Sequence, residues 1–402
     1  ISAYTDTNGV NAGSVYVLFG QTANQTSTVD LSALNGSNGF VINGINANDL
    51  TGSTVSFSND INGDGFGDIL ISADDASPNG KSDAGQSYVV FGASSFSTTL
   101  ELSSLDGNNG ITLNGATAKD DAAISTAGDI NGDGFDDLIV GAEDHTNFGN
   151  YGAGSSFLLF GSSSLASTIE LSEINASNGF IFLGQNFEDY SGTNVSQAGD
   201  VNGDGFDDLL ISAPNADPNG ISNAGTTYLL YGGNQFTGSA TQSGDSSDNT
   251  LTGTTAQDII AGGLGDDIII GSGGTDVLRG GAGDDTLAIS DISFQIINGG
   301  TGTDTLRLDG TDKTLNLTSL ADNKIQNIEN IDLSQSGNHT VALKLSDVLN
   351  ISDSTNTLKI IGSTSGDTVT ANSETWTQGT SSGGFTPYTL GNATLLIDDN
   401  ID

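Results

Sequence analysis

Acidic and amide side chains recur at fixed spacing in three nine-residue segments, which begin at Asp60, Asp129 and Asp200. In each segment, oxygen-bearing side chains occupy positions 1, 3, 5 and 9, and a glycine at position 6 permits a sharp turn. Calcium takes about six to eight oxygen ligands at about 2.3–2.6 Å, and such a loop can supply them from its side chains and the position-7 carbonyl. The spacing therefore predicts calcium-binding loops. An acidic Asn-Gly or Asp-Gly hairpin turn without metal is the alternative.

These loops differ from the helix–loop–helix calcium motif. That motif needs glutamate at position 12, where this chain has Ile71, Val140 and Ile211. Each loop is followed by an apolar run, a turn-rich stretch and an aromatic strand ending in glycine, as in residues 88–92. Short apolar runs separated by turn residues predict a small antiparallel sheet in each unit. The loops are therefore expected within β-hairpins.

The whole unit repeats with a long period, at intervals of 69 residues from Asp60 to Asp129 and 71 residues from there to Asp200. These units resemble FG-GAP repeats, the blades of the integrin-α-type β-propeller, over residues 1 to about 236. The FG element stands at residues 91–92 and 160–161. A degraded GAP element stands at residues 141–143 and 212–214.

The resemblance implies that the loops hold calcium through named positions. The implied side-chain ligands are Asp60, Asn62, Asp64 and Asp68, with counterparts Asp129, Asn131, Asp133, Asp137 and Asp200, Asn202, Asp204, Asp208. The implied carbonyl donors are Phe66, Phe135 and Phe206. Family propellers usually carry about seven blades. About three and a half here imply that upstream blades are missing or that another chain supplies strands.

From residue 244 the period changes to nine residues, most clearly in residues 262–270, 271–279 and 280–288. These copies resemble the RTX nonapeptide of secreted bacterial proteins, which implies a parallel β-roll. Two nonapeptides close a coil of 18 residues, so side chains 18 positions apart stack on one edge. That arrangement pairs Asp258 with Asp276 on one edge, stacks Asn249, Asp267 and Asp285 on the other, and leaves Asp304 in a further copy out of frame.

Stacked carboxylates repel one another, and a bound cation relieves that repulsion. We therefore expect several Ca2+ ions in this region and folding that is coupled to calcium. An ion-free, glycine-rich solenoid is the alternative.

Residues 310–402 have no strict period but contain β-type segments such as 328–333 and 393–397. They resemble the C-terminal regions that follow RTX repeats and carry type I secretion information. A β-rich cap is favoured here over a dedicated binding module. The expected architecture is all-β, with FG-GAP blades in residues 1–238 of which the first is incomplete, an RTX β-roll in residues 239–309, and the cap in residues 310–402.

The strongly acidic composition of the chain excludes some classes of binding partner. The chain has 50 acidic residues against 8 Lys and Arg, a formal net charge of −42. Such a chain repels phosphate backbones and anionic headgroups, so we expect neither nucleic-acid binding nor attachment to a membrane surface. It has no run of about 18 apolar residues, so we expect no membrane insertion. It has no cysteine, which excludes disulfides and thiolate chemistry.

The chain has two histidines, several acidic pairs and a group of aromatic residues that could suggest catalysis or sugar binding. His145 and His339 stand far apart in the sequence, lack metal-ligand spacing, and are predicted to be surface residues. Acidic pairs such as residues 136–137 and 266–267 lie within the predicted calcium loops. Trp376, Phe385 and Tyr388 are expected to form a satellite core rather than a sugar-stacking surface. We expect no enzyme activity.

The combined pattern predicts a secreted, extracellular calcium-binding structural or adhesive protein, a component of a surface layer, filament or matrix. It resembles parts of large secreted bacterial surface proteins. Its expected partners are further copies, other surface proteins or glycans. One alternative is the calcium-binding carrier part of a type I-secreted enzyme with an upstream catalytic domain. Another is a glycan- or protein-binding propeller. If Ile1 is a mature N-terminus, its incomplete blade predicts head-to-tail strand exchange and filaments.

Overall fold

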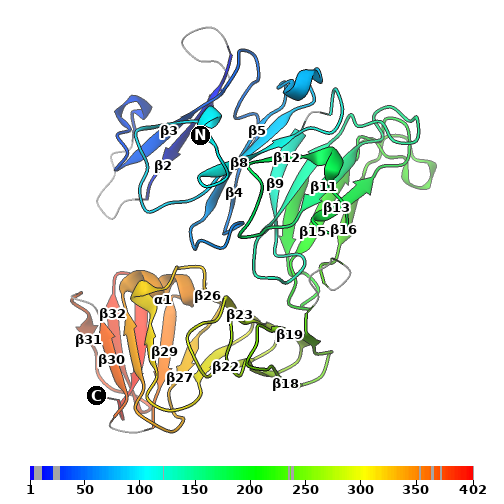
Figure 1. Cartoon of the computed structure of the whole chain (residues 1–402). Coiled ribbons are helices and arrows are strands. Elements are labelled where there is room, and N and C mark those ends of the chain that lie inside the picture. Colours follow the sequence, from blue (N-terminus) through cyan, green and yellow to red (C-terminus); the bar gives the residue numbers. More distant parts are fainter. Residues whose placement is uncertain are drawn as a thin grey trace. The chain divides into compact units, whose positions relative to one another are not determined.

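The computed structural model describes residues 1–3, 11–20, 28–120, 122–233, 236, 240–352, 355–363, 366–371 and 374–401. Within these ranges the chain is built from β-strands, short 3-10 turns and one short helix, α1 (Leu345–Ile351) (Figure 1). The predicted all-β fold class is therefore confirmed. The chain divides into two compact units, one comprising residues 1–130, 135–199 and 207–231, the other residues 131–134, 200–206 and 232–402.

The first unit consists of four small sheets, which we call blades 1 to 4, with antiparallel neighbours in each. Blade 1 contains β1 (Ser2–Ala3), β2 (Ser14–Leu18) and β3 (Gly39–Asn43). Blade 2 contains β4 (Val55–Ser58), β5 (Asp68–Ala73), β6 (Gln86–Val90) and β8 (Gly110–Asn114). Blade 3 contains β9 (Ala122–Gly128), β10 (Asp137–Ala142), β11 (Ser155–Leu159) and β13 (Gly179–Leu183). Blade 4 contains β14 (Val195–Gly199), β15 (Asp208–Ala213) and β16 (Thr226–Leu230).

Neighbouring blades also exchange a strand, a feature that the sequence analysis did not predict. The connection between the third and fourth strands of blade 2 includes β7 (Thr99–Glu101), which pairs in parallel with β3 of blade 1. The equivalent connection of blade 3 includes β12 (Thr168–Glu170), which pairs in parallel with β8 of blade 2. Each of these connections therefore closes the outer edge of the preceding blade.

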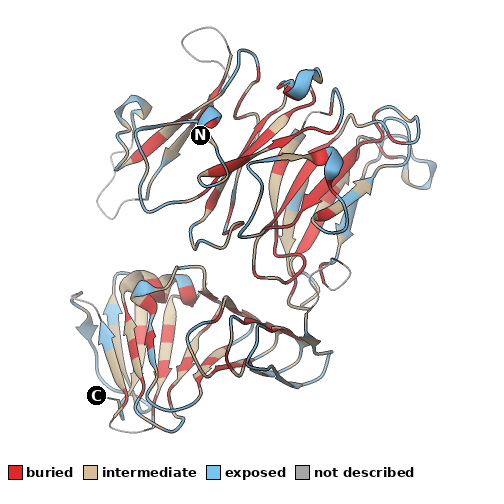
Figure 2. Cartoon of the chain, in the orientation of Figure 1, coloured by how far each residue is buried: buried red, intermediate tan, exposed pale blue. Residues whose placement is uncertain are grey.

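The core of this unit lies between the blades. One cluster joins blades 2 and 3 through side chains such as Val89, Ile111 and Val140, while another joins blades 1 and 2 through Phe40 and Tyr88. Strand β6 contributes to both clusters because its successive side chains point to opposite faces. This explains why residues 88–90 of the strand are apolar without a break, since a strand buried on both faces does not alternate with polar residues. Figure 2 shows this burial in the central strands of the blades.

The second unit is a parallel roll with two main sheets. One sheet contains β17 (Gln242–Ser243), β19 (Ile259–Leu264), β21 (Val277–Ala282), β23 (Ile296–Thr301) and β26 (Ile325–Gln326). The other runs through β18 (Thr250–Thr252), β20 (Ile268–Ile270), β22 (Thr286–Ile289), β24 (Thr305–Leu308), β27 (Asn330–Asp332), β29 (Thr357–Ile361) and β33 (Ala393–Asp398), and ends with β32 (Phe385–Leu390) and β31 (Thr377–Gln378). A third, smaller sheet contains β25 (Thr314–Asn316), β28 (Thr340–Leu343) and β30 (Thr368–Ala371).

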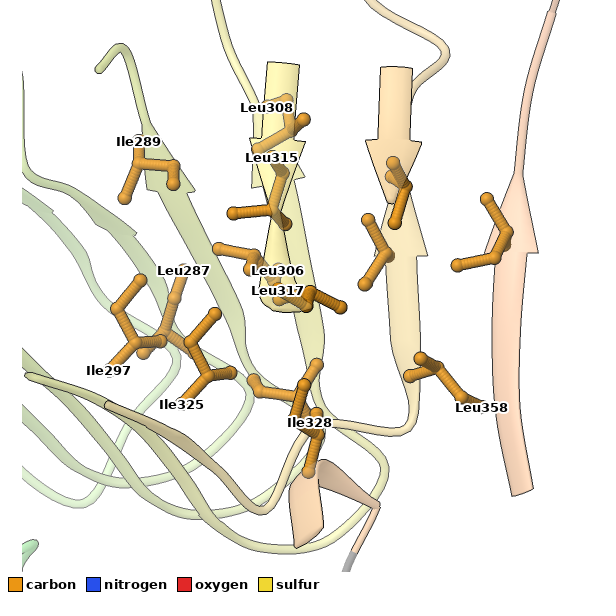
Figure 3. Close-up of a cluster of buried hydrophobic side chains, with 14 of the residues drawn as sticks. Leu287, Ile289, Ile297, Leu306, Leu308, Leu315, Leu317, Ile325, Ile328 and Leu358 are labelled. Atoms are coloured by element: carbon orange, nitrogen blue, oxygen red, sulfur yellow. The ribbon is translucent and has the colours of Figure 1, made fainter. Parts of the chain in front are cut away.

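The strand register reproduces the predicted 18-residue coil, with Ile269 opposite Leu287. The out-of-frame copy is accommodated by a 19-residue step, which places Leu287 opposite Leu306. The longer sheet then continues from β24 to β27, so the predicted boundary near residue 309 falls within one continuous sheet. One apolar cluster runs through the roll and the cap, as Figure 3 shows for Leu287, Leu306 and Leu358. The division into three domains stays a prediction.

No helix within the described ranges is long and apolar enough to span a membrane.

Candidate metal centres

The three predicted loops each connect the first and second strands of a blade. Residues 60–68 join β4 to β5, residues 129–137 join β9 to β10, and residues 200–208 join β14 to β15. The glycines at positions 4 and 6 have positive φ in all three loops, for example 75° at Gly63 and 88° at Gly65. Other residues adopt this left-handed backbone only with strain, which explains the repeated glycines.

Position 1 of the loop organises the turn. One carboxylate oxygen of Asp60 accepts the N–H groups of Gly63 and Asp64, at 2.7 and 3.0 Å, and the other accepts that of Gly65 at 2.8 Å. Asp200 accepts the corresponding three bonds in blade 4. Since these loops are far apart in the sequence, the repeated geometry is encoded locally.

Positions 3 and 5 are bonded to each other. Asn62 Nδ2 donates to Asp64 Oδ2 at 2.9 Å, and Asp64 N donates to Asn62 Oδ1 at 3.0 Å. The same amide–carboxylate bond joins Asn131 to Asp133 and Asn202 to Asp204. The predicted position-1, 3 and 5 side chains therefore lie within one turn.

The aspartate at position 9 also has a structural role, which the sequence did not predict. Asp68 is fully buried; its Oδ2 accepts the N–H of Ile61 at 2.8 Å and its Oδ1 accepts that of Gly92 at 2.9 Å. Burial raises the pKa of Asp68 to about 7. Asp137 makes the equivalent bonds to Ile130 and Gly161.

Gly92 and Gly161 are the glycines of the FG element. This aspartate thus ties the loop to the end of the third strand. Each carboxylate oxygen has two lone pairs, so accepting one N–H leaves a second position for a metal ion. The assignment of Asp68 and Asp137 as ligands stays a prediction.

Carboxylates alone do not make a metal centre in the described part of the chain. No group of three or more Asp, Glu, His or Cys side chains among the described residues converges closely enough to hold a metal ion. Calcium in a blade loop would therefore need the amide oxygen of position 3 and backbone carbonyls in addition to carboxylates. Such mixed oxygen sets suit calcium, which accepts carbonyl ligands in flexible geometry.

The roll carries the predicted stack of aspartates along one edge. The backbone N–H of Asn249 donates to Asp267 Oδ1 at 2.7 Å, that of Asp267 to Asp285 Oδ1 at 2.7 Å, and that of Asp285 to Asp304 Oδ1 at 2.8 Å. The out-of-frame Asp304 therefore remains in the stack. We call this series of residues 249, 267, 285, 304 and 329 the aspartate ladder, because Asp304 N in turn donates to Glu329 Oε2 at 2.8 Å.

Glu329 was not among the predicted site residues. It lies outside the nonapeptide copies, and only the continuation of the sheet places it next to Asp304. On the other edge of the roll, Asp258 N donates to Asp276 Oδ1 at 2.9 Å, as the predicted pairing requires.

Three ladder carboxylates have an unsatisfied oxygen. The Oδ2 atoms of Asp267, Asp285 and Asp304 are buried and have no hydrogen-bond partner among the described residues. A buried polar atom without a partner is unfavourable by about 1–3 kcal/mol, and by more when it carries charge. Burial and neighbouring carboxylates raise the pKa of Asp285 to about 6 and that of Asp304 to about 7. A cation would satisfy these oxygens and remove the repulsion, so the residues fit calcium.

The first glycine of each nonapeptide provides space for the carboxylate. A Cβ atom on Gly262 would overlap Asp267 Oδ2, and a Cβ atom on Gly280 would overlap Asp285 Oδ2. This explains why glycine recurs at position 1 of the repeat. The glycine and the aspartate five positions later therefore form one structural pair.

Comparisons with known proteins agree with this geometry. The model of the FG-GAP repeat matches residues 51–90, 122–159 and 191–230. The model of the RTX calcium-binding nonapeptide repeat matches residues 243–278 and 252–287. The chain therefore carries three FG-GAP repeats followed by RTX calcium-binding repeats, and the predicted combination is confirmed. RTX repeats bind calcium, which supports the predicted Ca2+; the number of ions stays a prediction.

Two curated proteins are similar to part of the chain. Integrin alpha-PS5 and integrin alpha-PS3, both from Drosophila melanogaster, are each 29% identical to it over 164 residues. Each alignment covers 39% of this chain but only 14% or 13% of the integrin. The chain therefore matches a small part of these relatives. Repeats of these two kinds are typical of extracellular proteins with structural or adhesive rather than enzymatic domains.

The two histidines differ in their environments. His145 is partly buried, and its Nδ1 lies 3.0 Å from Asp120 Oδ1. His339 is fully buried, so the prediction that it is a surface residue is wrong. Its backbone N–H donates to Asp367 Oδ1 at 2.8 Å, in the same manner as in the aspartate ladder, and Lys313 N donates to its Nδ1 at 3.3 Å. Its Nδ1 therefore has a partner from a neighbouring coil, whereas its Nε2 is buried and has no hydrogen-bond partner among the described residues.

The aromatic residues of the cap are part of its packing. Trp376 and Tyr388 are partly buried against the apolar cluster that runs through the roll and the cap, rather than in a separate satellite core. The Lys359 ammonium lies 4.2 Å from the centre of the Phe385 ring. These contacts assign the three aromatic side chains a structural role.

Proposed function

We propose that this chain is an extracellular, calcium-binding structural or adhesive protein whose roll completes its folding when it binds Ca2+. The observation that carries this proposal is the aspartate ladder with its buried, unsatisfied carboxylate oxygens at Asp267, Asp285 and Asp304. Several ions would be bound in the roll, and further ions in the loops of blades 2 to 4.

The electrostatic argument begins with the close stacking of like charges. The carboxylates of Asp285 and Asp304 each accept a hydrogen bond from the backbone N–H of the preceding ladder residue, so the carboxyl groups are held one coil apart, a strand spacing of about 4.8 Å. No ion pair with Lys or Arg reaches Asp267, Asp285 or Asp304 in the described structure. A divalent cation is therefore the available source of neutralising charge.

The whole-chain charge extends the argument. A net charge of −42 opposes compaction through self-repulsion. When ligand groups come together only in the folded chain, the free energy of metal binding contributes to folding. The chain would then remain loosely folded where calcium is scarce, as in a cytosol before export, and would fold in a calcium-rich exterior.

The proposed biological role follows from the repeat types. FG-GAP blades offer extended lateral surfaces, and a rigid calcium-bound roll serves as a spacer or anchor. We assign the chain to a surface layer, extracellular filament or matrix, secreted by a type I route, with copies of itself, other surface proteins or glycans as partners. Its similarity to two integrin α chains supports an adhesive role but names no ligand.

The decisive experiment measures calcium binding and folding together. The full chain is stripped of metal with a chelator and titrated with Ca2+, while calorimetry records binding and circular dichroism records folding. The variant Asp285→Asn removes one ladder carboxylate, and we expect at least about tenfold weaker binding of one or more ions. The matched control is Asp322→Asn, which removes the same charge from an exposed carboxylate at the surface of the second unit.

The proposal predicts that the roll gains β-structure on calcium addition and that only the ladder variant impairs this gain. An unchanged spectrum between chelator and millimolar Ca2+ would overturn it. Equal calcium affinities in the ladder variant and the surface control would show that the aspartate ladder is not the calcium-binding site.

A further inference from the structure

Blade 4 ends at its third strand. In blades 1 to 3 the third strand pairs with a fourth, antiparallel strand: β2 with β3, β6 with β8, and β11 with β13. Strand β16 pairs with β15 on one side, and no described residue pairs with its other edge. A sheet edge with unpaired backbone groups is a ready template for a further strand.

The chain leaves too little length for a fourth strand of the usual kind. Strands β8 and β13 each begin twenty positions after the preceding third strand ends, from Val90 to Gly110 and from Leu159 to Gly179. After Leu230 the roll begins only twelve positions later, at Gln242. The segment between blade 4 and the roll therefore lacks the length of the other connections.

The exposure of equivalent residues shows the consequence. Tyr228 is 48% exposed, whereas its counterparts Tyr88 and Phe157 are 0% and 2% exposed. Leu229 is 43% exposed, whereas Val89 is fully buried. Figure 2 shows the same contrast between β16 and the buried β11. The third strand of blade 4 thus has the apolar side chains of a covered strand, although no described strand pairs with its outer edge.

Among the described residues, the outer edge of blade 3 also has no strand paired with it. Strands β3 and β8 each receive a parallel strand, β7 or β12, from the third-to-fourth connection of the next blade. Strand β13 receives no such strand from the described residues. Its side chains Ile181 and Leu183 are 38% and 47% exposed.

These two open surfaces border one groove. It has a volume of about 660 Å³, and its lining includes Ile181, Leu183, Ile211, Tyr228 and Leu230. A single connection of the β7–β8 or β12–β13 type would meet both edges, because it contains one strand for each. The groove therefore has the location and lining of a site for one such segment.

We propose that this groove binds an extended segment of another protein that has the sequence pattern of this chain's own third-to-fourth connections. The pattern begins with a short strand, as in residues 99–101 or 168–170, and ends with a strand that starts with glycine and an apolar residue, as in residues 110–114 or 179–183. The ligand would complete blade 4 and the outer edge of blade 3 by β-augmentation.

The internal blades define the register of the bound segment. Tyr88 lies opposite Thr112 and Val90 lies opposite Gly110; in blade 3, Phe157 lies opposite Ile181 and Leu159 lies opposite Gly179. By the same rule Leu230 lies opposite the glycine of the ligand and Tyr228 lies opposite its third residue. The ligand strand runs antiparallel to β16.

The glycine would determine specificity. Gly110 has a φ of 150°, and a Cβ atom there would overlap the carbonyl oxygen of Val89. Gly39 and Gly179 have equally close contacts with the carbonyl oxygens of Val17 and Leu158. In blade 4 the corresponding carbonyl is that of Leu229. A ligand with any larger residue at this position would not reach the edge of β16.

A partner of this pattern is favoured over a second copy of the chain. The strands of this type that the structure describes, β3, β8 and β13, are already paired within their own blades. The net charge of −42 also repels a second copy and favours a neutral or basic segment. The inference rests on the blade geometry and is independent of the proposed calcium function.

The test uses the full chain in calcium and a fluorescent peptide with the sequence of residues 99–115, the chain's own β7–β8 connection, carrying the changes Glu101→Gln and Asp106→Asn so that its side chains are uncharged. We expect saturable binding with one peptide per chain by fluorescence anisotropy. A second peptide with valine in place of the glycine at position 110 should bind at least tenfold more weakly. Hydrogen exchange should show new protection at residues 226–230 and 179–183.

Two protein variants complete the test. Tyr228→Asp should weaken peptide binding at least tenfold, whereas Phe148→Asp, at a 79% exposed position on the loop between β10 and β11, should leave it unchanged. Circular dichroism establishes that both variants are folded. Failure of the peptide to bind, or equal binding of the glycine and valine peptides, would overturn the proposal. Concentration-dependent dimers that block the peptide would assign the face to a second copy and would also overturn it.

Discussion

The carboxylate of Asp136 accepts a hydrogen bond of 2.8 Å from the backbone N–H of Asn59, across the boundary between blades 3 and 2. The same oxygen accepts a bond of 2.9 Å from Ser58 Oγ. Asp207 of blade 4 makes the equivalent bond of 2.9 Å to Asp129 N of blade 3. The aspartate at the eighth position of the loop therefore links consecutive blades. In the acidic pair, Asp136 bonds to the preceding blade, whereas Asp137 bonds to Ile130 and Gly161 of its own repeat.

Replacing Asp136 by alanine should weaken the boundary between blades 2 and 3. The change leaves the N–H of the exposed Asn59 and the hydroxyl of the buried Ser58 without their acceptor, and for the buried hydroxyl the cost is about 1–3 kcal/mol. We expect a lower midpoint in thermal unfolding of the full chain in calcium. Asp75→Ala, at an exposed position, serves as the control. Equal midpoints for the two variants would contradict the linking role.

Replacing Asp68 by alanine should destabilise blade 2 even when no metal is present. Asp68 is fully buried and satisfies the N–H groups of Ile61 and Gly92, so its loss leaves one buried and one partly buried donor without partners. The expected loss is about 2–4 kcal/mol, and the measurement is thermal unfolding in excess chelator.

Asp64→Ala is the comparison for this experiment, because Asp64 is exposed and belongs to the same loop. It should alter stability mainly in calcium. If both variants unfold like the wild type in chelator, Asp68 acts only through a metal and its structural role is refuted.

Replacing Gly262 by alanine should disturb the aspartate ladder through a single methyl group. The backbone of Gly262 has no positive φ, so alanine is compatible with its conformation, but the new Cβ atom would overlap Asp267 Oδ2 and the carbonyl oxygen of Gly280 in the next coil. We expect at least about tenfold weaker calcium binding, measured by calorimetry. The matched control is Gly20→Ala, where a Cβ atom meets no described neighbour within 4 Å. Unaltered calcium affinity in Gly262→Ala would disprove the glycine–aspartate pairing.

Removal of calcium should change the fluorescence of Trp376, the single tryptophan of the chain. Its side chain packs against the apolar cluster that runs through the roll and the cap. Loosening of the roll would therefore expose the indole ring to water and shift its emission to longer wavelength. Mg2+ is the control cation, because it demands stricter octahedral geometry and retains water ligands. An emission maximum that is the same in chelator and in calcium would show that the packing of Trp376 in the cap does not depend on calcium binding in the roll.

The repeats made much of this structure predictable from the sequence. The 18-residue coil follows from the nonapeptide period, and it correctly stacked Asn249, Asp267 and Asp285. The turn at Gly63 and Gly65 follows from residue chemistry alone, since only glycine adopts that backbone freely. Local rules of this kind operate over a few residues and are visible in one sequence.

The unpredicted features depend on contacts between distant segments. The exchange of β7 onto β3 joins two blades, and its three residues carry no distinctive pattern of their own. Glu329 enters the ladder because the sheet continues beyond the last nonapeptide, although its spacing from Asp304 differs from the repeat. Burial of His339 likewise depends on Asp367 and Lys313, which the sequence does not place beside it.

The aspartate ladder has a direction. Every donor N–H lies one coil before the carboxylate that accepts it, so each coil is oriented by the coil that follows it in the sequence. The cap end of the ladder can therefore act as a template, from which ordered coils propagate toward the N-terminal side of the roll. Loss of the first coil would leave the remaining acceptors in place, whereas loss of Glu329 would remove the group that orients Asp304 and, through it, every earlier coil.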